Sequence, residues 1–460
     1  MRALHRALPL LDPIVPLMLA GAMVGFGVLI GAAAAGEAPR LSVTAMLAIA
    51  MAAVLFSLTP KALFLAWFGV APLLQGASLS PLGQKLTLAL YLAPPLVFAI
   101  WTLTRRPGWI RPRLLDILPL AYFLDVSASV MIAGEHSSGT MKGIYKSVGI
   151  GCLMYYFFAL GPIGSLSAAS IAAVMLVVTV VEGGMSIIDG LTGWNLWHDT
   201  SERFDVPRRA VATLTGPAVL GTLLAVGIVL AVAILVWNGP PRLRILAIIA
   251  LIVGFPGLYF ALTRGPIVGT LIGVIAVLLT RTKTRLLAVA ALVLAVVVLT
   301  LSWGRITSST VYRERATNSG NVQARILLDQ GSLKLVEKKP LLGWGYNNFD
   351  QANATAGVSS VSVEKYGAVL TSHNTFLTVL VNQGIIGLFL FLLPWVVIPW
   401  RTFKDVAGQP DLRWFTVGAL AALGAYVATA NTTDFKYFSF VPAIPWMLLG
   451  LLRRRQLAEG

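Results

Sequence analysis

Charged residues are unusually scarce in this chain. Asp, Glu, Lys and Arg together make up 12% of the 460 residues, whereas 57% are hydrophobic. Soluble globular domains carry about 25% charged residues, so the composition excludes an ordinary soluble domain. The sequence instead predicts a polytopic membrane protein, because several windows of about 18–20 apolar residues are long enough to span a bilayer.

Cysteine is almost absent and histidine is rare. Cys152 is the only cysteine, which excludes an intramolecular disulfide and a cysteine-based metal site. The chain also lacks a Gly-Lys-Ser/Thr phosphate loop, a paired-carboxylate motif and a serine nucleophile elbow. The four histidines are far apart in sequence and show no metal-ligand spacing: His5, His136, His198 and His373. We therefore predict no metal site and no cofactor.

Apolar segments follow one another along most of the chain. Their middles are nearly free of charge, Asp125 being the main exception. Two segments are short for a hydrocarbon core of about 30 Å, so we expect an all-α membrane protein with about 12–14 transmembrane helices. The candidate spans are 14–35, 41–58, 62–74, 84–103, 114–133, 143–161, 166–182, 212–237, 243–262, 266–280, 286–302, 375–400, 414–430 and 437–452.

Lysine and arginine collect in short loops on alternate sides of these spans, and this bias predicts the orientation. With a cytoplasmic N-terminus, the cytoplasmic face receives the basic residues of 105–113, 281–285 and 453–455. The formal net charge of +16 then reflects mainly this bias rather than a nucleic-acid partner. We predict that both termini are cytoplasmic.

The interval from Trp303 to Asn374 departs from the apolar pattern. A loop of about 70 residues far exceeds the ordinary connection of about 4–6 residues and is typically functional or disordered. This loop is net basic although it would lie on the extracytoplasmic face, and its apolar spacing predicts a helix over Val322–Glu337. We expect an N-terminal bundle (1–302), this loop with short helices (303–374) and C-terminal helices (375–460), forming one integrated membrane domain.

Two arginines at the expected outer face are candidates for binding an anion. Gly265-Pro266 follows Arg264 and suits a new helix N-terminus, whose N–H groups attract anions; a snorkelling arginine is the alternative. Arg325 begins the expected loop helix, where an ion pair with Asp329 is the alternative. Guanidinium groups bind phosphate oxygens through paired hydrogen bonds.

The segment KKPLLGWGYNNF predicts a tight turn after the loop helix. Its glycines would allow a close backbone approach, and its aromatic residues could stack on a sugar or settle at the membrane interface. Our candidates for substrate binding in this turn are Lys339, Gly343, Trp344, Gly345 and Tyr346.

His373 stands at the expected outer mouth of the next span. A histidine with an ordinary pKa near 6.5 can accept a proton near neutral pH, and the adjacent Asn374 can donate and accept hydrogen bonds. A purely structural histidine is the alternative. Four carboxylates near the same face could orient partners or form ordinary loop ion pairs: Glu182, Asp189, Asp199 and Asp434.

Arginines, a histidine and aromatic residues beside a lipid phase suit a substrate with an anionic head and a lipid tail. Pyrophosphate leaving from a sugar requires positive charge where negative charge develops. A base near an acceptor hydroxyl would complete a displacement at the anomeric carbon.

The same residues resemble the signature of the O-antigen ligase and polymerase superfamily of bacterial envelope proteins. In that family an arginine opens the loop helix, a Pro-Leu-Leu-Gly-x-Gly turn follows, and His-Asn begins a helix with Gly-x-x-Gly. The corresponding residues here are Arg325, Pro340–Gly345, His373-Asn374, Gly384 and Gly387, and Thr263–Gly265 is similar to a further family arginine.

The resemblance implies a multi-pass inner-membrane glycosyltransferase that needs neither metal nor nucleotide. It would take a glycan from undecaprenyl pyrophosphate on the periplasmic face, with Arg264 and Arg325 on the pyrophosphate and His373 assisting the acceptor. Ligases use lipid A–core as acceptor, and we favour this activity; polymerases use another glycan repeat unit. A transporter or flippase of a lipid-linked glycan is an alternative of another class, although it would call for more intramembrane charge and for internal repeats.

Overall fold

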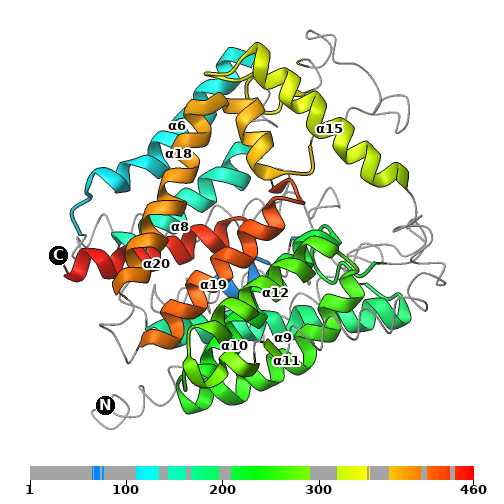
Figure 1. Cartoon of the computed structure of the whole chain (residues 1–460), viewed down its shortest axis with the longest axis vertical. Helices are drawn as coiled ribbons and strands as arrows, with labels where there is room; N and C mark the ends of the chain where they lie inside the picture. The colour runs from blue at the N-terminus through cyan, green and yellow to red at the C-terminus, as the bar shows by residue number, and fades with distance from the viewer. Residues whose placement is uncertain are drawn as a thin grey trace, which may run out of the picture. The chain divides into compact units, whose positions relative to one another are not determined.

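A computed structural model describes a large part of the chain (Figure 1). The described residues are 65, 67–72, 75–76, 110–133, 143–161, 167–195, 209–287, 289–290, 319–349, 352, 372–405, 412–435 and 441–459. The expected spans 14–35, 41–58 and 84–103 lie outside these residues, and those at 62–74 and 286–302 lie partly or largely outside them.

Five described helices are long and apolar enough to cross a membrane. They are α6 (Leu114–Ala133), α9 (Ala168–Thr192), α10 (Pro217–Val236), α11 (Pro241–Ala261) and α18 (Thr375–Asp405). The others are the π-helix η2 (Tyr145–Gly149), α8 (Ile150–Ala159), α12 (Arg264–Leu279), α15 (Ser319–Lys338), α19 (Arg413–Ala430) and α20 (Ala443–Glu459). The protein is therefore an all-α polytopic membrane protein, as the sequence predicts.

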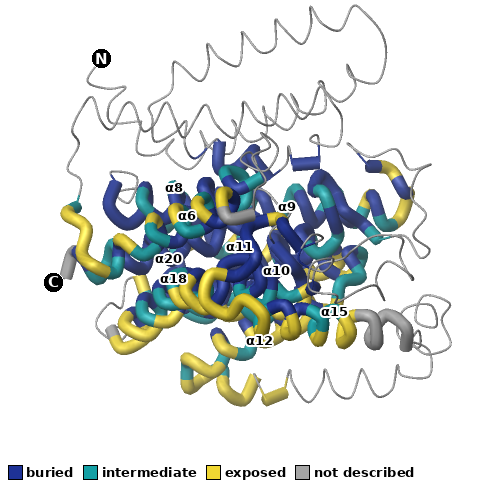
Figure 2. Tube along the Cα trace, turned by 90° about the horizontal axis from the view of Figure 1, so that it is seen from above, coloured by how far each residue is buried: buried dark blue, intermediate teal, exposed yellow. Residues whose placement is uncertain are grey.

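The chain forms two compact units whose segments interleave in sequence. One unit comprises Met1–Trp109, Gly161–Thr263 and Asp411–Gly418, and the other Ile110–Leu160, Arg264–Pro410 and Ala419–Gly460. In the first unit α9, α10 and α11 pack together, and α10 is buried along nearly its whole length (Figure 2). At Gly257 of α11 an added Cβ would lie 2.7 Å from the Gly183 Cα of α9, so small residues permit this close packing.

Helix α9 ends ten residues later than the sequence predicted. The predicted span ended at residue 182, but the helix continues to Thr192, so Gly183–Thr192 does not belong to an outer loop. Glu182 accepts hydrogen bonds from the hydroxyl and backbone N–H of Thr213, and Asp189 accepts one from the Val211 N–H at 2.9 Å. These fully buried carboxylates accept the hydrogen bonds of N–H and hydroxyl groups in the segment before α10. Because these donors satisfy the carboxylates, α9 can continue beyond the apolar run.

The second unit is built around α6, α8, α18 and α20, and α6 runs beside α18 (Figure 1). A buried ion pair joins two of these helices: Arg453 Nε of α20 lies 2.8 Å from Asp116 Oδ1 of α6. Tyr155 of α8 donates a hydrogen bond to the same oxygen at 2.7 Å. A buried pair of charges is tolerated only when its remaining hydrogen-bonding capacity is filled, as it is here.

Helix α18 is interrupted at Gly384, whose φ of 66° and ψ of −166° are not helical. The turn after α15 fills the gap, because the N–H groups of Trp344 and Gly345 donate to the carbonyls of Val381 and Asn382 at 2.9 and 2.8 Å. In return, the N–H groups of residues 385 and 386 donate to the carbonyls of residues 340 and 341. The turn therefore supplies the hydrogen bonds that the broken helix lacks, as a membrane-embedded break requires.

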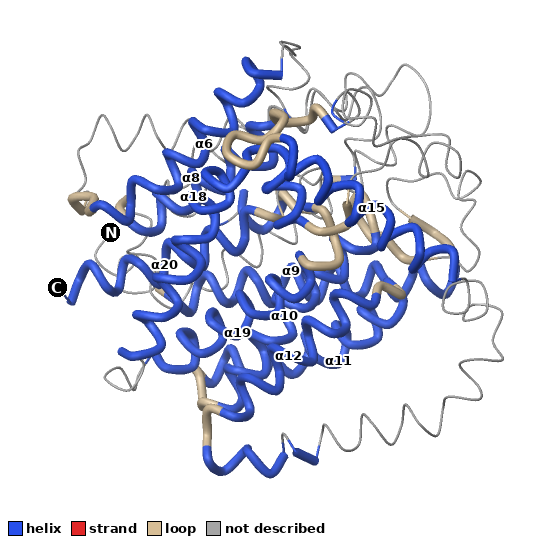
Figure 3. Tube along the Cα trace, turned by 45° about the horizontal axis from the view of Figure 1, so that its top comes forward, coloured by secondary structure: helices blue, strands red, loops and turns tan. Residues whose placement is uncertain are grey.

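Gly387 marks a close contact between α18 and α6. An added Cβ at Gly387 would lie 2.7 Å from Asp125 Oδ2, the carboxylate noted as the main intramembrane charge. The two glycines of the Gly-x-x-Gly pattern thus have separate roles, one in the helix break and one in helix packing. Loops and turns connect the helices, and the described residues contain no strand (Figure 3).

Candidate functional site

His373 precedes the first turn of α18, and Asn374 caps that helix. The Asn374 side-chain oxygen accepts hydrogen bonds from the N–H groups of Phe376 at 3.0 Å and Leu377 at 3.2 Å. Capping of this kind fixes the direction in which the chain enters a helix. The oxygen of Asn374 is therefore engaged in the fold, and only its amide nitrogen is left to serve a substrate.

The loop after α19 holds the start of α18 in place. The Thr375 hydroxyl donates to the Thr433 carbonyl at 2.7 Å and accepts from the Phe435 N–H at 3.0 Å. One turn later, the Thr378 hydroxyl donates to Asp434 Oδ2 at 3.0 Å. Asp434, predicted to orient partners or to form a loop ion pair, is buried and holds α18.

Arg264 is the first residue of α12 and is exposed. The next residue, Gly265, packs against the Thr432 side chain so closely that an added Cβ would overlap the Thr432 hydroxyl. Thr432 adjoins Thr433, which is bonded to Thr375. The starts of α12 and α18 are therefore linked through the same short turn after α19.

Arg325 lies on α15 and is also exposed. Partial burial lowers the pKa of His373, and the positive charge of Arg325 lowers it further. Partial burial raises the pKa of Asp329, one turn along α15, and Arg325 opposes that rise. Arg325 thus interacts electrostatically with both residues, and His373 is kept in its neutral, proton-accepting form near pH 7.

The turn residues are largely accounted for by the fold. Gly343 has a φ of 67°, and an added Cβ would lie 2.6 Å from the Val381 carbonyl oxygen; Gly345 has a φ of 95°. These values favour glycine, so both residues shape the turn that fills the break in α18.

Trp344 belongs to a small hydrophobic core between α15 and α18, and its indole N–H donates to the Leu335 carbonyl at 2.9 Å. The Lys339 ammonium lies 4.2 Å from the Trp344 ring centroid, a cation–π contact. Trp344 is only 6% exposed, so its ring packs within the protein rather than offering a face to a sugar. Lys339 itself is exposed.

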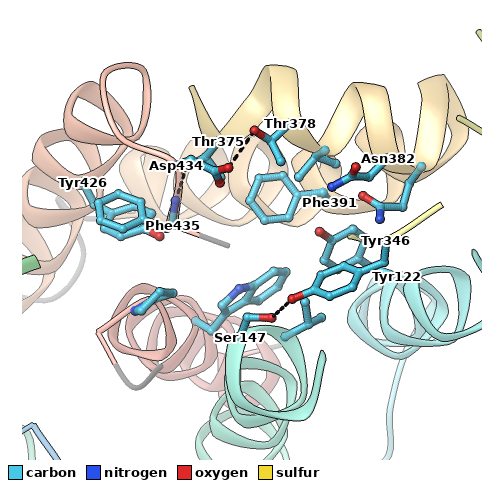
Figure 4. Close-up of a pocket in the computed structure, with 15 residues that line it drawn as sticks. Tyr122, Ser147, Tyr346, Thr375, Thr378, Asn382, Phe391, Tyr426, Asp434 and Phe435 are labelled. Atoms are coloured by element: carbon cyan, nitrogen blue, oxygen red, sulfur yellow. Dashed lines mark hydrogen bonds between the residues drawn. The ribbon is translucent and has the colours of Figure 1, made fainter. Parts of the chain in front are cut away.

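Tyr346 reaches a different environment from Trp344, because it lines a cavity in the second unit. The Ser147 hydroxyl donates to the Gly143 carbonyl, so the Tyr346 hydroxyl, 3.0 Å away, donates to Ser147. The cavity has a volume of about 60 Å³. Its lining residues are Tyr122, Ser147, Val148, Tyr346, Thr375, Thr378, Val379, Asn382, Gln383, Phe391, Tyr426, Asp434, Phe435, Pro442 and Trp446 (Figure 4).

This aromatic cavity contains residues that the sequence analysis missed. Tyr122 and Phe391 pack with ring centroids 5.2 Å apart, and Phe391 lies 5.9 Å from Trp446. The adjacent amides Asn382 and Gln383 interrupt an apolar helix, a pattern typical of functional positions inside membranes. That pair could have been singled out from sequence, whereas the aromatic residues carry no such signal because apolar helices commonly contain them.

Arg264 begins α12, Arg325 lies on α15 and His373 precedes α18. The aromatic cavity is lined in part by the first turns of α18. Within the described ranges, no group of three or more His, Cys, Asp or Glu side chains is arranged to hold a metal ion. Arginine charge can stabilise an anionic leaving group, and a neutral histidine can accept a proton.

Comparison with known proteins identifies one family. Residues 249–392 match the family model described as O-Antigen ligase. No curated protein matches the chain significantly. The matched segment includes Arg264, Arg325 and His373, the turn at 340–345 and the break at Gly384. This match supports the O-antigen ligase superfamily for residues 249–392.

Proposed function

We propose that the protein is an O-antigen ligase that moves a polysaccharide from undecaprenyl pyrophosphate to a hydroxyl group of lipid A–core. The reaction takes place at the periplasmic face of the bacterial inner membrane, with both chain termini in the cytoplasm. The observation that carries the proposal is the match of residues 249–392 to the O-antigen ligase family. Within this segment, the charge of Arg325 on α15 lowers the pKa of His373, which precedes α18.

Each proposed role follows from the chemistry of the side chain. Arg264 and Arg325 hold the pyrophosphate, where guanidinium groups neutralise the charge that develops as it leaves. Neutral His373 accepts the proton of the acceptor hydroxyl as that oxygen bonds to the anomeric carbon. The bond from the anomeric carbon to the phosphate oxygen breaks, and undecaprenyl pyrophosphate departs with the bonding electrons.

The direct test is transfer by the purified full-length protein. The protein is mixed with an undecaprenyl-pyrophosphate-linked glycan and lipid A–core, without nucleotide or added metal, and the products are separated by gel electrophoresis and mass spectrometry. Glycan on lipid A–core is the expected result. Lengthened donor without modified lipid A–core would identify a polymerase instead. Movement of intact donor across a vesicle membrane without any transfer would identify a transporter.

The pH profile of transfer should reveal the Arg325–His373 interaction. A base is active in its neutral form, so activity falls as pH falls through the pKa of His373. Because Arg325 lowers this pKa, Arg325→Gln should raise it and move the acid limb of kcat/KM to higher pH. Transfer rates between pH 5 and 9 measure the shift.

Arg264→Gln is the matched control for this profile, because Arg264 does not contribute to the shifted pKa of His373. It should lower the rate, since it removes a pyrophosphate ligand, while leaving the acid limb in place. Equal displacement of the limb in both variants would contradict the assigned interaction.

A further inference from the structure

Two buried amides line the aromatic cavity with hydrogen-bonding capacity to spare. Asn382 and Gln383 are each 2% exposed. The Asn382 Oδ1 and Gln383 Nε2 atoms find no hydrogen-bond partner among the described residues. An unsatisfied buried polar atom destabilises a protein, so such atoms occur mainly where a ligand or water completes their hydrogen bonds. They are one acceptor and one donor, on consecutive residues.

The charge of the residues that line the cavity indicates which kind of ligand could form hydrogen bonds with these two amides. Of the fifteen described lining residues, Asp434 is the only one with a charged side chain, and none is a lysine, arginine or histidine. A carboxylate repels an anion but accepts hydrogen bonds from hydroxyl groups. Pyrophosphate therefore does not fit this cavity, whereas a neutral molecule rich in hydroxyls does.

The aromatic rings that line the cavity also suit a sugar. Rings of Tyr122, Phe391 and Trp446 supply apolar area against which the C–H face of a sugar can pack. Figure 4 shows Asn382 and Asp434 on opposite sides of Phe391, so polar groups flank an aromatic centre.

We propose that the aromatic cavity binds one neutral pyranose residue of a glycan, with Asn382 and Gln383 as its hydrogen-bonding partners. The proposal rests on the proposed function in that a glycan substrate is what reaches the cavity. Thr375 lines the cavity two residues after His373, so a sugar held there would lie beside the proposed base while the arginines hold the charged group.

Binding is tested with free sugars and the full-length protein in lipid nanodiscs, because detergents with maltose or glucose head groups would compete. Saturation-transfer NMR is recorded with methyl β-glucoside, methyl β-galactoside and methyl N-acetyl-β-glucosaminide, and with methyl β-glucuronide as the charged counterpart. We expect at least one neutral glycoside to bind, and glucuronide to bind at least fivefold more weakly. The absence of binding by every neutral glycoside would overturn the proposal.

The paired variant Asn382→Leu/Gln383→Met removes both amides with little change in volume. It should weaken binding of the neutral glycoside at least tenfold while thermal unfolding stays unchanged or moves to higher temperature, because each lost amide had an unsatisfied polar atom. A purely structural role predicts the reverse, with lower thermal stability and unaltered sugar binding, and would reject the site.

A second variant acts through charge alone. Asp434→Asn retains an oxygen that can accept the hydrogen bond of Thr378 and should bring glucuronide binding to within about twofold of the neutral sugar. Unchanged selectivity would contradict the role of Asp434.

The transfer assay separates this proposal from the proposed function. Active transfer by wild-type protein that binds no free glycoside would reject the cavity but retain the ligase. Glycoside binding without transfer would reject the ligase but retain the cavity. Where both hold, a higher KM for donor or for acceptor in the paired variant identifies which glycan supplies the sugar.

Discussion

Replacing His373 with alanine should lower the rate of glycan transfer by about 10²–10⁴-fold, the usual contribution of a general base. His373 lies at the surface with its ring only partly buried, so its removal creates no enclosed cavity, and the variant should unfold at the wild-type temperature. Asn374, which caps α18, remains in place to hold the backbone. Transfer to lipid A–core, normalised to folded protein, measures the effect.

Chemical rescue distinguishes a proton acceptor from a positioning group. Added imidazole should restore part of the rate of His373→Ala if the ring acts as a base, and the restored rate should rise with pH as imidazole loses its proton. His373→Gln keeps hydrogen bonding but cannot accept a proton near pH 7, so it should be nearly as slow as alanine. Wild-type activity in either variant would remove His373 from the mechanism.

Replacing Gly384 with alanine should destabilise the protein by more than about 3 kcal/mol, because the required backbone conformation is nearly restricted to glycine. An added Cβ would also overlap the Leu341 carbonyl and lie 2.7 Å from the Leu342 nitrogen. Relief would require the turn at 340–345 to withdraw, which breaks its hydrogen bonds to α18. Thermal unfolding and the yield of monodisperse protein after size-exclusion chromatography measure the loss.

Gly424→Ala is the matched control for Gly384. Gly424 lies within α19 and has no atom within 4 Å of an added Cβ. Alanine favours a helix over glycine by up to about 1 kcal/mol, so this variant should unfold at the wild-type temperature or above it. If Gly384→Ala matched Gly424→Ala, the proposed insertion of the turn into α18 would be wrong.

The His373→Ala and Gly384→Ala variants should lose transfer activity for different reasons. His373→Ala leaves the fold intact and removes transfer, whereas Gly384→Ala removes folded protein and with it the support for His373. Wild-type stability together with lost transfer is therefore the expected signature of His373 alone.

Composition and local patterns were sufficient for the class of fold. A chain with so few charges cannot form an ordinary soluble domain, and most of the described apolar segments became helices near their expected bounds, with α9 as an exception. The loop helix predicted over 322–337 occurs as Ser319–Lys338. Arg264, Arg325 and His373 could be selected from sequence because charged or titratable groups beside apolar segments are conspicuous, although their roles remain proposals.

Three features of the protein depend on contacts between residues distant in sequence, which local sequence patterns do not reveal. The extension of α9 to Thr192 depends on N–H donors more than twenty residues away along the chain, which no local periodicity reveals. The glycines of the turn were expected to admit a substrate, but their neighbour across space is the broken backbone of α18. Trp344 and Tyr346, two residues apart, have different surroundings because a turn directs one into a hydrophobic core and the other into a cavity.

The sequence by itself determined a helical membrane protein with cationic residues beside its apolar segments, since composition and periodicity follow directly from the order of residues. Only the tertiary structure decided that Asn382 and Gln383 share a cavity with Asp434, because helices distant in sequence must pack before their side chains can meet.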